Sequence, residues 1–184
     1  MPQDRASGRR RQSHGGVTKR SFAEAMAILK IVTLEDEEIL RKQCRPVDKI
    51  TSRTLTLLDD MYETMQAANG VGLAAPQVGI LRRIVIVDVG EGLIELINPE
   101  IIVTEGEQEG EEGCLSVPEE VGIVKRPMKV TVKAIDREGK PFTVTGEGLL
   151  ARAFCHELDH LDGVLYIDRA SRMLTPEELE DDED

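Results

Sequence analysis

The run His156-Glu157-Leu158-Asp159-His160 constrains the fold more than any other part of the sequence. In an α-helix, residues four positions apart lie about 40° apart around the axis and roughly 6 Å apart along it, so both imidazoles can bind one metal ion. Glu157 would then lie beside a metal-bound water and could act as its general base. The alternative is two helical histidines that face solvent or pack in a core. The central glutamate, in a chain with 3 histidines, favours a hydrolytic metal site.

The hydrophobic pattern predicts an α+β fold, with short, mainly antiparallel strands packed around a central metal-binding helix, Leu149 to Leu161. A second helix is predicted from about Ser52 to Ala68, because apolar residues recur at helical spacing and Asn69-Gly70 follows. The runs predicted to be strands are Arg83 to Val89, Leu93 to Val103, Lys129 to Asp136 and Pro141 to Thr145. The turn Asp136-Arg137-Glu138-Gly139 indicates a hairpin between the last two.

Charge is distributed unevenly along the 184 residues and suggests three parts. Residues 1–25 carry six basic side chains and no hydrophobic period, which predicts a disordered basic N-terminal extension. This extension could be a mis-assigned start, a remnant of an expression tag or a weak transit peptide. Residues 26–172 are the expected single catalytic domain. Residues 173–184 are the expected acidic C-terminal tail, because the last ten positions hold seven acids and no base.

The overall composition argues against several function classes. The net charge of −12 is a poor match for a nucleic-acid backbone, so direct nucleic-acid binding is not expected. No apolar stretch approaches the roughly 20 residues that cross a bilayer, so no membrane association is expected. The 3 cysteines are odd in number and widely spaced, which favours a reducing compartment. We expect a cytoplasmic protein, or an organellar one if residues 1–25 act as a transit peptide.

A catalytic metal usually has three protein ligands and one open position, so a third ligand must come from elsewhere in the chain. Cys155 is adjacent to His156 and points about 100° away around the helix, which favours a buried structural role. Cys44 lies in a polar turn before a proline, with no reactive group nearby in sequence. Cys114 lies in a glycine-containing extended run, Glu111 to Pro118, and could complete a Cys-His-His site. Spacing alone leaves this assignment open.

The run Gly70-Val71-Gly72-Leu73-Ala74-Ala75-Pro76-Gln77 is also unusual, because its small residues let the backbone approach another element closely. No Lys-Ser/Thr pair follows it, so it does not match a phosphate-binding P-loop. It could be a tight helix-to-strand turn. Beside a hydrolytic metal, Gln77 becomes a candidate oxyanion donor.

The runs Gly70 to Gln77, Glu112 to Ser116 and His156 to His160 together resemble, in order and spacing, the three motifs of peptide deformylase. The resemblance spans about Met26 to Arg169. It implies a metal-dependent hydrolase that removes the N-formyl group from the formylmethionine terminus of nascent polypeptides. Those peptides are the expected partners, with transient proximity to the ribosome. The acidic C-terminal end has the wrong sign for docking on RNA.

The resemblance also implies roles for the residues at matching positions. The implied metal ligands are Cys114, His156 and His160. Glu157 corresponds to the general acid/base, while the Gln77 side chain and the Leu115 backbone N–H correspond to oxyanion donors. The family commonly uses ferrous iron, so one divalent metal, Fe²⁺, is the expected cofactor, with Zn²⁺ or Ni²⁺ as alternatives. Glu112 and Asp159 could orient the ligands through hydrogen bonds, or could simply be solvated acids.

A pocket for the methionine side chain is predicted on one face of the ligand helix. Leu149 and Ala153 share this face with His156 and can form an apolar wall beside the metal. Val71 and Gly72 are expected on the opposite side of the pocket from this wall. Pockets for the methionine side chain in the peptide deformylase family resemble this arrangement. Arg152 can line the rim with its aliphatic stem while its charge reaches solvent. The alternative is ordinary core packing of Leu149 and Ala153.

Two other function classes share part of this pattern. A zincin-like metallopeptidase also uses His-Glu-x-x-His, but commonly takes its third ligand from a downstream glutamate or histidine. No histidine follows His160, although several carboxylates do. A non-catalytic, metal-stabilised protein that binds nascent chains would leave Glu157 and Gln77 without a role. The native metal, the oligomeric state and any residue preference beyond methionine stay open.

Overall fold

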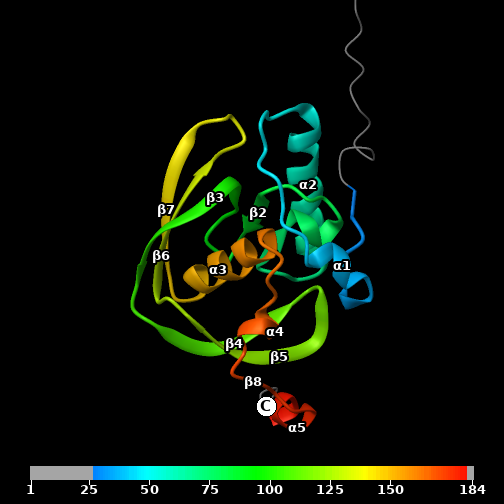
Figure 1. The fold of residues 1–184 in the computed structure, drawn as a ribbon, viewed down its shortest axis with the longest axis vertical. Coiled ribbons are helices and arrows are strands. Elements are labelled where there is room, and N and C mark those ends of the chain that lie inside the picture. The colour runs from blue at the N-terminus through cyan, green and yellow to red at the C-terminus, as the bar shows by residue number, and fades with distance from the viewer. Residues whose placement is uncertain (1–26, 182–184) are drawn as a thin grey trace, which may run out of the picture.

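The computed structural model of the chain describes residues 27–181, and Figure 1 shows how their elements are arranged. The predicted N-terminal extension, residues 1–25, lies outside this part of the chain. Helix α3 (Leu149–Leu161) lies in the middle of the molecule and contacts both a five-stranded and a three-stranded sheet. All strand pairs within the two sheets are antiparallel, so the predicted α+β class is confirmed.

The larger sheet has the strand order β1-β2-β3-β6-β7. Its strands are β1 (Gly72–Ala74), β2 (Ile84–Val87), β3 (Ile94–Glu105), β6 (Lys129–Ile135) and β7 (Pro141–Glu147). Except for β1, these strands match the predicted runs to within about two residues at each end. The predicted hairpin between β6 and β7 is present, and the Asp136 backbone N–H donates to the Lys140 carbonyl at 2.9 Å. Strand β1 was not predicted, because three small or apolar residues are too few to reveal a strand period.

The smaller sheet has the strand order β4-β5-β8. Its strands are β4 (Gln108–Cys114), β5 (Val117–Arg126) and β8 (Arg172–Met173). The pairing shifts register between Gly113 and Cys114, so that Cys114 lies opposite Val117. Such an irregularity bends a strand and changes the direction of the side chain that follows it. The register shift therefore contributes to the direction in which the Cys114 side chain points.

The helices in residues 27–181 are mostly short. They are α1 (Glu37–Leu40), α2 (Ser52–Ala67), α3, α4 (Tyr166–Arg169) and α5 (Pro176–Asp181), with 3-10 turns η1 (Leu34–Asp36) and η2 (Ala75–Val78). The two predicted helices are confirmed, although α2 ends one residue before Ala68. None of these helices has the length and apolar character that would let it cross a membrane.

Strand β2 packs between the two long helices, α2 and α3. Val85 and Val87 belong to the buried cluster that contains α3, whereas Ile84 and Ile86 belong to the cluster that contains α2. Successive side chains of a strand point to opposite faces of a sheet, so both faces of β2 are covered. Burial of both faces explains why β2 is a continuous aliphatic run. The packing of β2 against α3 also fixes the position of this helix, which carries two of the candidate metal ligands.

The end of α3 depends on Gly163, and we expect Gly163→Ala to lower the free energy of unfolding by about 2 kcal/mol or more. Gly163 has φ +73°, and a Cβ there would lie 2.3 Å from the Arg41 carbonyl oxygen. Gly139→Ala is the control, because its φ is +81° but the nearest atom to a new Cβ is Ile50 Cδ1 at 3.9 Å. Urea denaturation of both variants tests this, and equal losses would contradict the packing argument.

Candidate metal centre

Three side chains from two elements, α3 and β4, bring possible metal ligands together. The ligand atoms of Cys114, His156 and His160 all lie within 4.8 Å of one another. Two come from consecutive turns of α3 and the third from the last residue of β4. Cys114 Sγ lies 3.4 Å from His160 Nε2. Among residues 27–181, this is the one group of three or more histidine, cysteine or acidic side chains that could hold a metal ion in this way.

The other two cysteines lie outside this group, as predicted. Cys155 and Cys44 are both buried. Burial raises the pKa of each thiol to about 11, so both remain protonated at neutral pH. Neither sulfur is among the three candidate ligand atoms.

Glu112 orients the first histidine. Its Oε1 accepts a hydrogen bond from His156 Nδ1 at 2.6 Å, which leaves His156 Nε2 free as a ligand atom. Burial alone would raise the pKa of Glu112, but hydrogen bonds from His156 and Arg126 outweigh it and lower the pKa to about 2. Glu112 is therefore an anion at neutral pH. The role considered for Glu112 as a ligand-orienting group agrees with these contacts.

Two arginines hold Glu112 in place, and sequence reasoning missed one of them. Arg126 Nη2 lies 2.6 Å from Glu112 Oε1, and Arg126 Nη1 lies 2.7 Å from Asp159 Oδ2. Asp159 also pairs with Arg169 at 2.7 Å, so it reaches the metal ligands only through Arg126 and Glu112. The predicted strands give no signal for Arg126, because it lies in β5 (Val117–Arg126), which is not among them.

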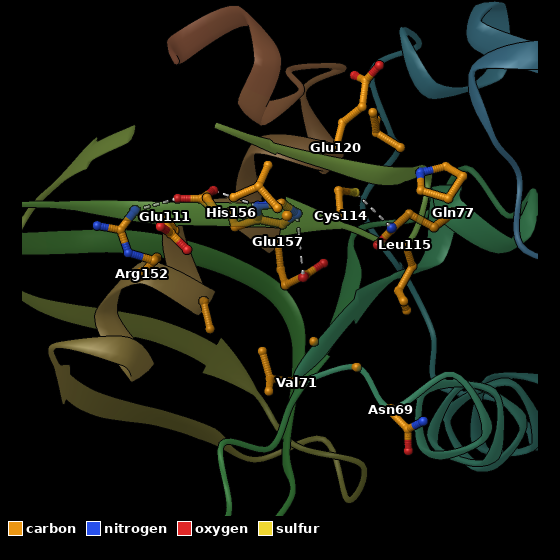
Figure 2. Close-up of a pocket in the computed structure, with 18 of the residues that line it drawn as sticks. Asn69, Val71, Gln77, Glu111, Cys114, Leu115, Glu120, Arg152, His156 and Glu157 are labelled. Atoms are coloured by element: carbon orange, nitrogen blue, oxygen red, sulfur yellow. Dashed lines mark hydrogen bonds and ion pairs between the residues drawn. The ribbon is translucent and has the colours of Figure 1, made fainter. Parts of the chain in front are cut away.

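The predicted orientation of Arg152 is wrong. Its charge does not reach solvent, because the residue is 7% exposed and its Nη1 donates to Glu112 Oε2 at 2.8 Å and to the Val124 carbonyl at 3.0 Å. A buried carboxylate needs cationic or hydrogen-bonding partners, and this need draws Arg152 inward. Arg152 nevertheless lines the cavity beside the candidate ligands, as Figure 2 shows.

Glu157 lies between the candidate ligands and the backbone of β1. Its Oε1 is 4.0 Å from His156 Nε2, and its Oε2 has no hydrogen-bond partner within residues 27–181. A Cβ at Gly72 would lie 2.6 Å from Glu157 Oε1, so only glycine leaves room for the carboxylate there. Burial raises the pKa of Glu157 to about 7, against the opposing effect of His156. Such a group can accept and return a proton near neutral pH.

The Gln77 side chain is fixed on the other side of the candidate ligands (Figure 2). Gln77 Oε1 accepts the Ala74 backbone N–H at 2.9 Å, and Gln77 Nε2 donates to Ser116 Oγ at 3.1 Å and towards Cys114 Sγ at 3.5 Å. These contacts orient the amide nitrogen towards the candidate metal centre. Sequence reasoning did not identify Ser116 as the group that fixes Gln77.

Comparison with known proteins relates the whole described fold to one family. The family model described as polypeptide deformylase matches residues 28–175. The peptide deformylase of Thermoanaerobacter pseudethanolicus is 61% identical over 155 residues, which cover 84% of this chain and 97% of that protein. The chain belongs to the peptide deformylase family. It is therefore a hydrolase that removes the N-formyl group from nascent polypeptides, and the family is metal-dependent.

Crystal structures of peptide deformylases share the fold. The structure from Thermotoga maritima is matched with a TM-score of 0.76 and 42% identity, over 79% of this chain and 99% of that one. The structure from Legionella pneumophila is matched with a TM-score of 0.75 and 46% identity, over 85% of this chain and 96% of that one. Both matches agree with the α+β arrangement of two antiparallel sheets around α3.

In this deformylase fold, a cavity of about 710 Å³ opens beside the candidate metal centre. The residues predicted for the substrate pocket all line it: Val71, Gly72, Leu149, Arg152 and Ala153. Leu149 is 55% exposed and Val71 is 44% exposed, so both present apolar surface that no described residue covers. Leu115 lines the same cavity directly after Cys114. The cavity therefore brings Cys114, His156, Glu157 and an apolar wall into one space.

Proposed function

We propose that the chain performs deformylation at the centre formed by Cys114, His156 and His160, with Glu157 as general acid/base. The observation that supports this most is the convergence of the three ligand atoms within 4.8 Å, beside a cavity that is lined by Cys114, His156 and Glu157. The Gln77 side chain and the Leu115 backbone N–H are the proposed oxyanion donors. These are the roles that the resemblance to peptide deformylase implies, and the contacts of Gln77 and the burial of Glu157 support them.

The donor set fits one divalent metal. A thiolate and two imidazoles converge there from two elements, and the only unpartnered buried carboxylate oxygen nearby, within the described residues, is Glu157 Oε2. When bound, such an ion supplies Lewis acidity, which lowers the pKa of a water at the site and polarises the formyl carbonyl. We propose Fe²⁺ as the native ion, with Zn²⁺ or Ni²⁺ as substitutes. Metal analysis after anaerobic purification identifies it.

Glu157 carries the proton through the reaction. Its carboxylate takes a proton from the attacking water as the new C–O bond forms at the formyl carbon. It then gives this proton to the methionine nitrogen as the formyl C–N bond breaks, so the products are a free N-terminal amine and formic acid, which keeps the other proton of the water until it ionises to formate in solution. Glycine at position 72 leaves the space that this carboxylate occupies, because a Cβ there would lie 2.6 Å from Glu157 Oε1.

Gln77 and Leu115 stabilise the charge that builds on the carbonyl oxygen. Gln77 Nε2 is already oriented by the contacts of its amide with Ala74 and Ser116, so little reorganisation is needed during the reaction. Loss of one such donor typically raises the barrier by about 2.7–4 kcal/mol. The Leu115 N–H is the second donor that the resemblance implies, and Leu115 lines the cavity directly after Cys114.

The methionine side chain of the substrate would lie against the apolar part of the cavity. Leu149 and Ala153 form one wall through adjacent turns of α3, and Val71 and Gly72 form the facing edge. Arg152 contributes its aliphatic stem at the side, while its guanidinium is held by Glu112. The match of an unbranched thioether to this apolar space accounts for methionine selectivity.

The wider setting is also part of this proposal. The substrates are nascent chains, so we place the enzyme in the cytoplasm and transiently close to the ribosome. Residues 26–172 would form the catalytic domain, with residues 173–184 as an acidic tail. Within that tail the structure has Met173 in β8 and the short helix α5, whose Leu179 lines the catalytic cavity.

A peptide assay tests the proposed reaction. We expect the anaerobically purified protein to release formate from a formyl-Met tripeptide and to leave its peptide bonds and the unformylated tripeptide intact. Formate is measured enzymatically and peptide products by mass spectrometry. Backbone cleavage would support the metallopeptidase alternative instead. Bound metal without any turnover would support a non-catalytic binding protein.

A further inference from the structure

A second cavity lies at the beginning of α2, away from the candidate metal centre. It has a volume of about 740 Å³ and lies between the segment leading into α2 and the residues around the start of β2. A helix of 16 residues is about 24 Å long, and the residues just after α2, Asn69 and Gly70, line the catalytic cavity. The two cavities therefore lie near opposite ends of α2.

Four cations line this second cavity: Arg45, Lys49, Arg53 and Arg82. Arg45 and Arg82 form an isolated parallel bridge, which places two of the cations side by side. Lys49 and Arg53 come from the segment that enters α2. The one carboxylate in the lining is Asp48, so positive charge dominates the cavity.

The arginines of this cavity differ from the others in the described part of the chain. Residues 27–181 contain ten arginines, and seven of them form ion pairs with carboxylates. The remaining three are Arg45, Arg53 and Arg82, and all three line this cavity. In a chain with 35 acids and a net charge of −12, this gathering of unpaired cations leaves a local positive surface.

We propose that this cavity binds the phosphate groups of an RNA backbone. Arginine and lysine are the side chains that best recognise phosphate oxygens. All four cations are exposed at the rim and do not converge on a buried point, so they fit a chain of phosphates better than one enclosed anion. No aromatic side chain lines the cavity for base stacking, so the contact is with the backbone and independent of sequence.

This proposal departs from the expectation of no nucleic-acid contact, which rested on the net charge of the whole chain. Net charge averages over the surface, whereas folding gathers Arg45 and Arg82 beside the start of α2. Nascent chains are made on a particle rich in RNA, so an RNA contact at this end of α2 leaves the catalytic cavity at the other end free for the peptide.

The experiment compares two double variants with the full chain. Arg53→Gln/Arg82→Gln removes two cations of the cavity, and Lys133→Gln/Lys140→Gln removes two exposed lysines of the β6–β7 hairpin for which the structure gives no ion pair. Binding of a fluorescent single-stranded RNA 20-mer is measured by anisotropy over a salt series. Each lost phosphate contact lowers the slope of log K against log salt by about 0.7 for a single strand.

We expect the arginine variant to bind RNA about tenfold or more weakly at low salt and to lose about 1.4 from the slope, with the lysine variant close to the unmodified chain. Residues 1–25 are present in all three proteins, so their basic side chains do not affect the comparison. Formate release should be the same in all three. Equal RNA binding by the arginine variant and the unmodified chain would overturn the proposal. Inorganic phosphate or a nucleotide that binds through these arginines, with RNA binding unchanged, would overturn it too.

Discussion

Glu157→Gln is expected to lower kcat/KM for a formyl-Met peptide by about 10²–10⁴-fold, the usual contribution of a general acid/base. The amide keeps the shape of the carboxylate but cannot accept the proton of the attacking water. The change should leave the fold intact, because burial already disfavours the charged form of Glu157 and raises its pKa to about 7. The bound metal should also remain, since Glu157 lies outside the group of three ligand atoms.

Formate release and metal content, measured on the same anaerobic preparation, test this prediction. Glu138→Gln is the matched control, because Glu138 is an exposed glutamate in the turn between β6 and β7, remote from the catalytic cavity. It should keep full activity. If Glu157→Gln retained most of the turnover, another group would have to act as the base.

Cys114→Ala is expected to reduce the bound metal from about one ion per chain to nearly none, and activity should fall with it. Removal of a group that only orients a ligand typically costs 10–100-fold in metal affinity, so loss of a ligand itself should exceed about 100-fold. The remaining histidines sit on one helix and cannot replace a donor that comes from β4.

Cys155→Ala is the control for this second prediction. Both variants lose a thiol, but Cys155 is a buried residue of the α3 cluster and has no ligand atom at the centre. It should retain its metal and most of its activity, with a modest loss of stability. Metal content by mass spectrometry and formate release distinguish the two. Equal metal loss in both variants would contradict the assignment of Cys114 as a ligand.

The sequence predicted the elements whose side chains show a clear period. Helix α3 was predicted at the observed bounds, because its apolar residues and its two histidines repeat at helical spacing. Strand β2 was predicted because both of its faces are buried, which makes it a continuous aliphatic run. In both elements, burial determines the pattern of apolar residues so strongly that the element can be predicted from its own sequence, without knowledge of what it packs against.

Strand β4 could not be predicted in the same way. Its sequence, Gln-Glu-Gly-Glu-Glu-Gly-Cys, has charged residues and glycines in place of an alternating apolar face. Its regular structure comes from pairing with β5 and from the buried ion pairs of Glu112. The ion pair of Glu112 with Arg152 joins residues 40 positions apart in sequence, and no local period indicates it.

For the site, the sequence reached the residues that lie in recognisable runs, and it also suggested that Glu112 orients a ligand. It did not predict that Ser116, although part of such a run, holds Gln77, or that Arg126 holds Glu112. The error for Arg152 has the same origin. The position of Arg152 on the helix face was predicted. The direction of its guanidinium depends on Glu112, which lies in β4 of the smaller sheet.

The division of the candidate ligands between α3 and β4 links metal capture to the completion of folding. An early folding state that had formed α3 alone would present two imidazoles at helical spacing and would bind an ion weakly. Firm binding needs the smaller sheet to dock on α3, because only that step delivers Cys114 and seats Glu112 on His156. Metal retention during refolding would therefore report when the smaller sheet has docked on α3. The bound ion would in turn stabilise that final arrangement.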